Sequence, residues 1–247
     1  MRRFFRVRNP FLILLLLVFP NTACHNAQQN QASAPSTNEI RKKSSAYDGL
    51  LTVEVGGKYG FVDRTGKVVI NPQFDSVSQF SEGLAVVCLG KCEFFANQIH
   101  PDESKYGYID ESGKFVVNPQ FDYALDFSGG LAPVCMGDCG YRPVAPRKWG
   151  YIDVHGNTAV ALQFGDANPF AEEGLAAVCV GKCSGEGESW EGKWGYVDKT
   201  GKLVISPQFD NAFRFESGVA LVFIGKGKNP KRGYIDKTGA FIWNPTN

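Results

Sequence analysis

The chain has 247 residues, of which 43% are hydrophobic and 13% aromatic, and its formal net charge at pH 7 is +1. Glycine is frequent (28 residues) and methionine is scarce (2 residues). Abundant glycine and aromatic residues with regularly spaced turn signals favour an all-β protein. The near-neutral charge excludes the strongly basic balance that nucleic-acid binding proteins carry.

The first residues carry the pattern of an export signal. Four arginines lie within the first eight residues, and an unbroken apolar run follows at residues 11–19. This run is shorter than the roughly 20 apolar residues that span a bilayer, and it suits a secretory signal peptide. Cys24 follows a small residue, as at a bacterial lipoprotein cleavage site, although Asn21 stands where an aliphatic residue is usual. We expect a signal peptide at 1–23 and a lipid on Cys24, with cleavage to a secreted soluble protein as the alternative.

The next segment, 24–47, is rich in Gln, Asn, Ser and Ala and has almost no bulky apolar side chains. Such a segment cannot bury enough surface to offset its ordering entropy, so we expect a lipid-anchored, disordered tether. Removal of 1–23 takes away four of the 26 basic residues and none of the 25 acidic ones, which changes the net charge to −3. The remaining chain, 48–247, is expected to form one β domain.

One sequence block recurs five times in this domain. Its first copy reads KYGFVDRTGKVVINPQFD, and its fourth reads KWGYVDKTGKLVISPQFD. Repeats of this period are typical of arrays that bind or scaffold other molecules rather than of catalysts. The blocks begin at Lys58, Lys105, Lys148, Lys193 and Lys231, and the GLAxV-type segments that precede them begin at Gly49, Gly83, Gly130, Gly174 and Gly218.

Each of these five units is predicted to contain three strands in a row. Residues 84–87 exemplify the apolar first strand, residues 59–62 the aromatic second strand and residues 67–70 the β-branched third strand. We therefore expect tandem three-stranded β-meanders that form an open superhelical array. A closed, propeller-like arrangement is the alternative.

The connection between the second and third strands is predicted to be a bulged hairpin turn. Asp63 can accept hydrogen bonds from downstream N–H groups, and Gly66 can supply a positive φ. Pro72 has no N–H to donate and is expected to end the third strand, and residues 76–79 are expected to form an irregular or short helical turn. The side chains expected to fill the core are Phe74, Phe121, Phe164 and Phe209, together with Phe80, Phe127, Phe170 and Phe215.

Six of the seven cysteines form three matched C-x₃-C pairs, each after a GLAxV-type strand. In an exported protein, an even and regularly placed set is typical of disulfides. A three-residue reversal with glycine can bring the flanking Cα atoms within bonding reach, about 4.4–6.8 Å. Pairing between successive units, zinc binding and a redox-active dithiol are the alternatives. The three pairs are Cys88 with Cys92, Cys135 with Cys139, and Cys179 with Cys183.

The pattern K-[WY]-G-[YF]-[IV]-D-x-x-G-K followed by P-Q-F-D and F-x-x-G-L-A-x-V resembles the bacterial WG-repeat family. It covers residues 49–245 of the chain. The resemblance implies an exported or surface-located, β-rich repeat domain. It transfers no catalytic residue.

Insertions at 93–104, 140–147 and 184–192 interrupt the same place in successive units, where the binding loops of an array tend to lie. The aromatic residue before the repeat glycine in the first four copies could stack into a glycan-binding surface, but packing between units is the favoured interpretation. The last unit has a basic connection instead, which could contact an anionic lipid or cell-wall polymer. The candidate binding residues are Phe94, Phe95, Tyr141 and Trp190 in the insertions and Trp149 and Trp194 in the repeats, and the basic residues are Lys226, Lys228, Lys231 and Arg232.

The sequence contains no nucleophile elbow, phosphate-binding loop, zinc-binding helix or dinucleotide fingerprint. We therefore expect a non-catalytic, monomeric repeat protein of the bacterial envelope, without cofactors, that binds another protein through its insertions. Binding of cell-wall glycan is the alternative, and an unrecognised hydrolase is less favoured. The expected location is a membrane-anchored position that faces the periplasm or the cell surface.

Overall fold

A computed structural model describes residues 49–92, 103–139, 146–183, 191–225 and 229–246. All of them belong to one compact unit, Ala34–Asn247. Their regular structure is entirely β, and no helix among them is long and apolar enough to cross a membrane. The expectation of an all-β fold is confirmed.

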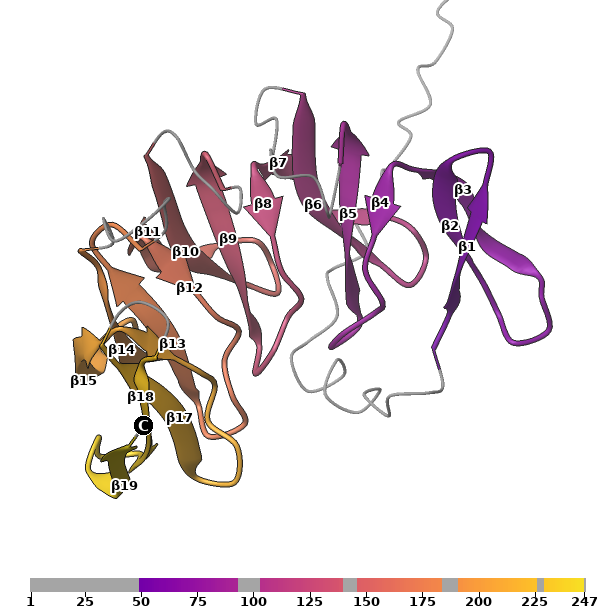
Figure 1. The fold of residues 1–247 in the computed structure, drawn as a ribbon. Helices are drawn as coiled ribbons and strands as arrows, with labels where there is room; N and C mark the ends of the chain where they lie inside the picture. The colour runs from indigo at the N-terminus through magenta and orange to yellow at the C-terminus, as the bar shows by residue number, and fades with distance from the viewer. Residues whose placement is uncertain (1–48, 93–102, 140–145, 184–190, 226–228, 247) are drawn as a thin grey trace, which may run out of the picture. The chain divides into compact units, whose positions relative to one another are not determined.

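The strands form five antiparallel sheets that follow one another along the chain, and none is closed into a barrel (Figure 1). The first sheet contains β1 (Leu51–Val55), β2 (Lys58–Val62) and β3 (Val68–Phe74). The second contains β4 (Ser76–Val77), β5 (Leu84–Gly90), β6 (Ser104–Asp110) and β7 (Phe115–Phe121), and the third β8 (Tyr123–Ala124), β9 (Leu131–Gly137), β10 (Arg147–Asp153) and β11 (Thr158–Phe164). The fourth contains β12 (Asp166–Ala167), β13 (Leu175–Val180), β14 (Lys193–Asp198) and β15 (Leu203–Phe209), and the fifth β16 (Asn211–Ala212), β17 (Val219–Ile224), β18 (Lys231–Asp236) and β19 (Phe241–Thr246).

Five repeat units are therefore confirmed. The first sheet has the three strands that were predicted for each unit, but each of the last four sheets has four. Each of these begins with a two-residue strand, such as β4, in the place where a helical or irregular turn was expected. β4 is a strand because Ser76 and Val77 pair with Cys88 and Val87 of β5. Strand pairing satisfies the backbone groups of this short segment, which the local sequence alone does not reveal.

The prediction that proline ends the third strand is wrong. β7 continues through Pro119 to Phe121. This is possible because β7 is an edge strand, where a missing N–H breaks no ladder. The β6–β7 pairing also shifts register between Tyr106 and Tyr108, and a Cβ on the intervening Gly107 would lie 2.5 Å from the Val117 oxygen. The repeat glycine therefore lets the bulged edge strand approach closely.

The turns between the second and third strands have the predicted geometry. In the first sheet, Asp63 Oδ1 accepts hydrogen bonds from the backbone nitrogens of Thr65 (2.8 Å) and Lys67 (3.1 Å) and from the Thr65 hydroxyl. Gly66 adopts φ of 83°. The two backbone bonds to the aspartate recur in the other four sheets, so the turn is a constant part of the unit.

The core lies between successive sheets. Each sheet has a forward face, which carries the aromatic residue Phe61, Tyr108, Tyr151, Tyr196 or Tyr234, and an opposite rear face. One cluster of buried residues joins each forward face to the rear face of the next sheet. Phe61 and Ile70, for example, pack with Ala85 and Val87. Of the phenylalanines predicted to fill the core, only Phe80 is half-buried rather than buried.

Polar contacts also recur from sheet to sheet. The hydroxyls of Tyr108, Tyr151 and Tyr196 each donate a hydrogen bond of 2.8 Å to a backbone oxygen 17 residues later, beyond the short strand of the next sheet. At the bends before β5 and β9, the Ser81 and Ser128 hydroxyls donate to the backbone oxygens of Phe127 and Phe170. These bonds fix the position of each sheet on its neighbour.

Candidate functional site

The insertions lie in the second, third and fourth sheets, at the bend between the two central strands of each sheet. In the second, third and fourth sheets this bend is closed by a disulfide between the two cysteines of one C-x₃-C pair, with Cα atoms 6.0–6.1 Å apart. The predicted pairing is confirmed, and the alternatives of inter-unit pairing, zinc ligation and a free dithiol do not hold for these six cysteines. The bend at the base of the insertion is therefore covalently closed.

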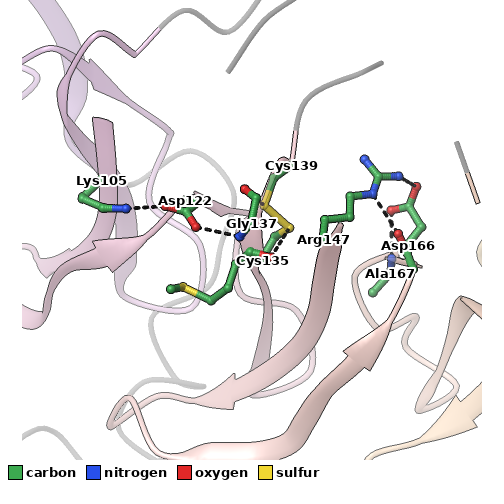
Figure 2. The surroundings of a disulfide bond; sticks show 10 residues. Lys105, Asp122, Cys135, Gly137, Cys139, Arg147, Asp166 and Ala167 are labelled. Atoms are coloured by element: carbon green, nitrogen blue, oxygen red, sulfur yellow. Dashed lines mark hydrogen bonds and ion pairs between the residues drawn. A yellow bond between two sulfur atoms is a disulfide. The ribbon is translucent and has the colours of Figure 1, made fainter. Parts of the chain in front are cut away.

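The carboxylate at the end of the preceding sequence block forms a hydrogen bond with the backbone of this bend. Asp122 accepts a hydrogen bond from the Gly137 nitrogen at 2.7 Å and pairs with the Lys105 ammonium (Figure 2). Asp75 repeats the arrangement with Gly90 and Lys58, at 2.9 and 2.5 Å. Asp210 repeats it again with Gly225 and Lys193, at 2.7 Å each.

We call this set of one carboxylate, one lysine and one glycine nitrogen the bend clamp. In the second sheet, burial acts to raise the pKa of Asp75. The bonds from Lys58 and the Gly90 nitrogen outweigh that effect, so the pKa of Asp75 lies below its ordinary value. The carboxylate therefore stays ionised, and the clamp stays closed, at neutral pH.

The bend of the fourth sheet is held differently. Gly165 replaces the clamp aspartate, and a Cβ at this position would lie 2.6 Å from the Cys183 sulfur. Lys148 keeps the position of the lysine, but the contacts come from the residue before it, Arg147, which donates from Nε to the Gly165 oxygen (2.8 Å) and pairs with Asp166 (2.9 Å; Figure 2). The Cys179–Cys183 bridge therefore lies closer to the sheet than a clamp aspartate would allow.

The described ends of the insertions are parts of the sheets. Ser104 pairs with Gly90, and Arg147 pairs with Gly137. The insertions expected at 93–104 and 140–147 are therefore too long at their C-terminal ends, because these residues continue the ladders of β6 and β10. Beyond the ladder, the Lys91 nitrogen donates to the Glu103 oxygen (3.0 Å), and the two side chains form an ion pair of 2.5 Å.

One apolar residue per bend is exposed beside the first cysteine. Leu89, Met136 and Val180 keep 39%, 42% and 42% of their surfaces exposed, although the cysteines before them are buried. They occupy the same register position in three sheets, one residue from the bend glycine. The described part of each insertion base therefore presents an apolar side chain to solvent.

The two repeat tryptophans do not form an exposed surface. Trp149 and Trp194 are only 4% and 8% exposed. Trp149 packs edge-on against Tyr123 with ring centroids 6.0 Å apart, and its buried Nε1 has no hydrogen-bond partner among the described residues. The favoured interpretation, packing between units, agrees with these positions, and an exposed aromatic stack at Trp149 and Trp194 does not. Cys24, Phe94, Phe95, Tyr141 and Trp190 lie outside the described residues.

The basic connection of the last unit is shorter than expected. Lys231 and Arg232 belong to β18, where they pair with Ile224 and Phe223. They lie in the strand because they continue its ladder, as the equivalent residues Lys105 and Tyr106 do in β6. Lys226 and Lys228 lie outside the described residues.

The family model for the WG-containing repeat matches residues 59–91, 106–138, 149–182 and 194–227. These four tandem matches cover more than half of the chain, so the chain belongs to the WG-repeat family. A search of curated proteins found no match. Each matched window begins in the aromatic strand of one sheet (β2, β6, β10 or β14) and ends after the first long strand of the next sheet (β5, β9, β13 or β17). One sequence repeat therefore contributes strands to two successive sheets.

Proposed function

We propose that the chain is a non-catalytic binding module, and that it recognises another protein through the insertions at its closed bends. The observation that carries this proposal is the contrast at each bend. In the second and third sheets, ladder pairs, a disulfide and the bend clamp support a connection whose length and sequence differ between sheets, and in the fourth sheet the disulfide and the Arg147 contacts do so. Variable loops on a rigid frame are the usual arrangement of binding surfaces.

A protein is the favoured partner because of what the described bases expose. Leu89, Met136 and Val180 offer apolar contact area beside charged groups such as Lys91. An apolar centre with a polar surround is typical of protein–protein interfaces. The burial of Trp149 and Trp194 removes the described residues that favoured a stacked glycan-binding surface. The glycan alternative thus depends on the aromatic residues of the insertions.

We further propose that the module works outside the cytoplasm of a bacterial cell. The basic and apolar residues at 1–19, Cys24 and the polar segment at 24–47 support a signal peptide, a lipid anchor and a spacer. The three disulfides are consistent with an oxidising compartment. Mass spectrometry of the N-terminal peptide from purified protein would detect a lipid on Cys24, and an unmodified Cys24 would contradict the anchor.

The binding proposal is tested by exchanging insertions. Residues 93–102, 140–145 and 184–190 are replaced, singly and together, by the short connection 226–228. Bound proteins from envelope extract are then quantified by affinity purification and mass spectrometry. His155→Ala serves as the control, because His155 is exposed in a turn between β10 and β11, at the opposite end of β10 from the insertion.

We expect the exchanged variants to lose a partner that the wild type and His155→Ala retain. A second set, Met136→Glu with Leu89→Glu and Val180→Glu, should weaken the same capture while the thermal midpoint stays within about 2 °C, since exposed positions carry little stability. Equal recovery of every protein by all variants would contradict the proposal. Retention on purified peptidoglycan that disappears with the insertions would favour the glycan alternative.

A further inference from the structure

The same cross-strand rows meet at every junction between sheets. On a forward face, the row runs from Val86 through Tyr108 to Val117 in the second sheet. On a rear face, it runs from Ala85 through Ile109 to Phe115. The forward row of each of the first four sheets faces the rear row of the next, and the first two residues of each of these rear rows, such as Ala85 and Ile109, belong to the buried clusters.

Two of these rows are exposed in the described structure. The forward row of the fifth sheet contains Tyr234 and Trp243, which are 46% and 60% exposed. The equivalent tyrosines of the second, third and fourth sheets are fully buried. The rear row of the first sheet begins with Leu51, which is 52% exposed, whereas the alanines at the same register position of the other four sheets are buried.

The two exposed rows carry complementary parts of a recurring contact. The turn glycine of each following sheet lies over a branched side chain of the sheet before it. A Cβ on Gly113 would lie 3.1 Å from Ile70, and a Cβ on Gly156 would lie 2.8 Å from Val117. Gly201 and Gly239 repeat this contact with Val160 and Ile205.

In the fifth sheet, Trp243 occupies the position of that branched side chain. In the first sheet, the turn glycine is Gly66, and no described atom lies within 4 Å of a Cβ built there. Gly66 therefore leaves room for a large side chain from another surface. Tyr234 occupies the register position of the tyrosines in the second, third and fourth sheets, whose hydroxyls donate hydrogen bonds to the following sheet.

We propose that copies of this chain associate head to tail, with the forward face of the fifth sheet of one copy packed on the rear face of the first sheet of another. The interface continues the sheet-to-sheet packing that joins the five sheets within one chain. A second copy is the occupant because its first sheet presents the rear row, Leu51, Val62 and Val68, in the register that the internal junctions use. The contact is heterologous, so it builds open chains or rings of copies rather than a symmetric dimer. The association replaces the monomer that the sequence predicted, and it does not depend on the insertions.

The test is site-specific photo-crosslinking in cells that produce the full chain. Benzoylphenylalanine replaces Tyr234, and a second, differently tagged copy is produced beside it. We expect an adduct of twice the chain mass, with higher multiples, whose crosslinked peptide comes from residues 51–74. The matched control places the crosslinker at Lys237, an exposed turn residue of the same sheet away from the forward row.

The decisive variant carries Leu51→Glu in the second copy. Leu51 is exposed, so the fold should be preserved, and the adduct should fall by about tenfold or more because an unpaired carboxylate would be buried, as the equivalent alanines are at the internal junctions. No adduct, an adduct with a different protein, equal adducts from position 237, or insensitivity to the glutamate at position 51 would each overturn the proposal. Exchange of the three insertions should leave the adduct unchanged, so its outcome is independent of the proposed function.

Discussion

Gly107 lies where the edge strand β7 bulges toward β6. A Cβ there would meet three backbone atoms of β7, at 2.5 Å from the Val117 oxygen, 2.7 Å from the Pro119 nitrogen and 2.9 Å from the Asn118 carbonyl carbon. Backbone atoms cannot rotate away as a side chain can. The tryptophan or tyrosine of each of the first four repeats is therefore followed by glycine for a steric reason.

Gly107→Ala is expected to lower the free energy of unfolding by about 3 kcal/mol, at the upper end of what overpacking costs. Urea unfolding followed by circular dichroism measures the loss. Gly49→Ala is the matched control, since no described atom lies within 4 Å of its Cβ and its φ is not in the left-handed region. Equal stability of the two variants would show that the close approach is not a constraint.

The turn aspartates make the stability of the fold depend on pH. The hydrogen bond from the Thr200 hydroxyl is the largest cause that holds the pKa of Asp198 below its ordinary value; desolvation opposes it, and bonds from the Thr200 and Lys202 nitrogens add to the lowering. Because the folded-state pKa is depressed, the stabilisation is present above the unfolded-state pKa, about 3.9, and is lost as the pH falls through the folded-state value.

Asp198→Ala should therefore reduce the urea midpoint at pH 7, and the difference from the wild type should shrink when both proteins are measured near pH 3. Thr200→Val, which removes the hydroxyl bond and keeps the carboxylate, should show a smaller difference at pH 7. A gap between Asp198→Ala and wild type that grows on acidification would contradict the assignment of the carboxylate as the stabilising form.

At the scale of the element, local chemistry in the sequence explains what could be predicted. Asp63 and Gly66 specify their turn through bonds and φ within four residues, and the C-x₃-C spacing brings two cysteines together without help from distant segments. The continuation of β7 through Pro119 and the pairing of β4 could not be predicted this way, since both depend on which strand lies beside them.

The candidate site, too, could be predicted from the sequence only in part. The disulfide bends follow from sequence spacing, but the bend clamp was not predicted. Its members, such as Lys105, Asp122 and the Gly137 nitrogen, are 15–32 residues apart. A signal for the bend clamp is present in the sequence. Each of the first four blocks begins with a lysine, and in three of them an aspartate lies 17 residues after that lysine.

Each disulfide is expected to stabilise its own bend without being required for the fold. The chain-entropy model gives about 2 kcal/mol for a ring of this size. Cys135→Ala with Cys139→Ala should lose about that amount in urea unfolding and should keep the β circular dichroism of the wild type. The fifth sheet, whose strands form without any cysteine at the equivalent bend, is the internal precedent. Complete unfolding on reduction of all three bridges would contradict this expectation.

At the scale of the whole molecule, the sequence repeat ties each sheet to the next. The window 59–91 contributes β3 to the first sheet and β4 and β5 to the second, so a single repeat has no sheet of its own. Four buried clusters then lie one at each junction. A sheet in the middle of the array is covered on both faces, and the described first and fifth sheets are covered on one. Stability should therefore depend on nearest neighbours, as in other repeat proteins.

Hydrogen exchange tests this claim most directly. β2, β6, β10, β14 and β18 hold the same place in their sheets, paired on both sides with a strand at least as long, and differ in how many faces of the sheet are covered. At low protein concentration, which disfavours association, we predict that the amides of β6, β10 and β14 exchange about tenfold or more slowly than those of β2 and β18. Equal protection in all five strands, or greatest protection in β2 or β18, would contradict the account of an array held together by its sheet-to-sheet junctions.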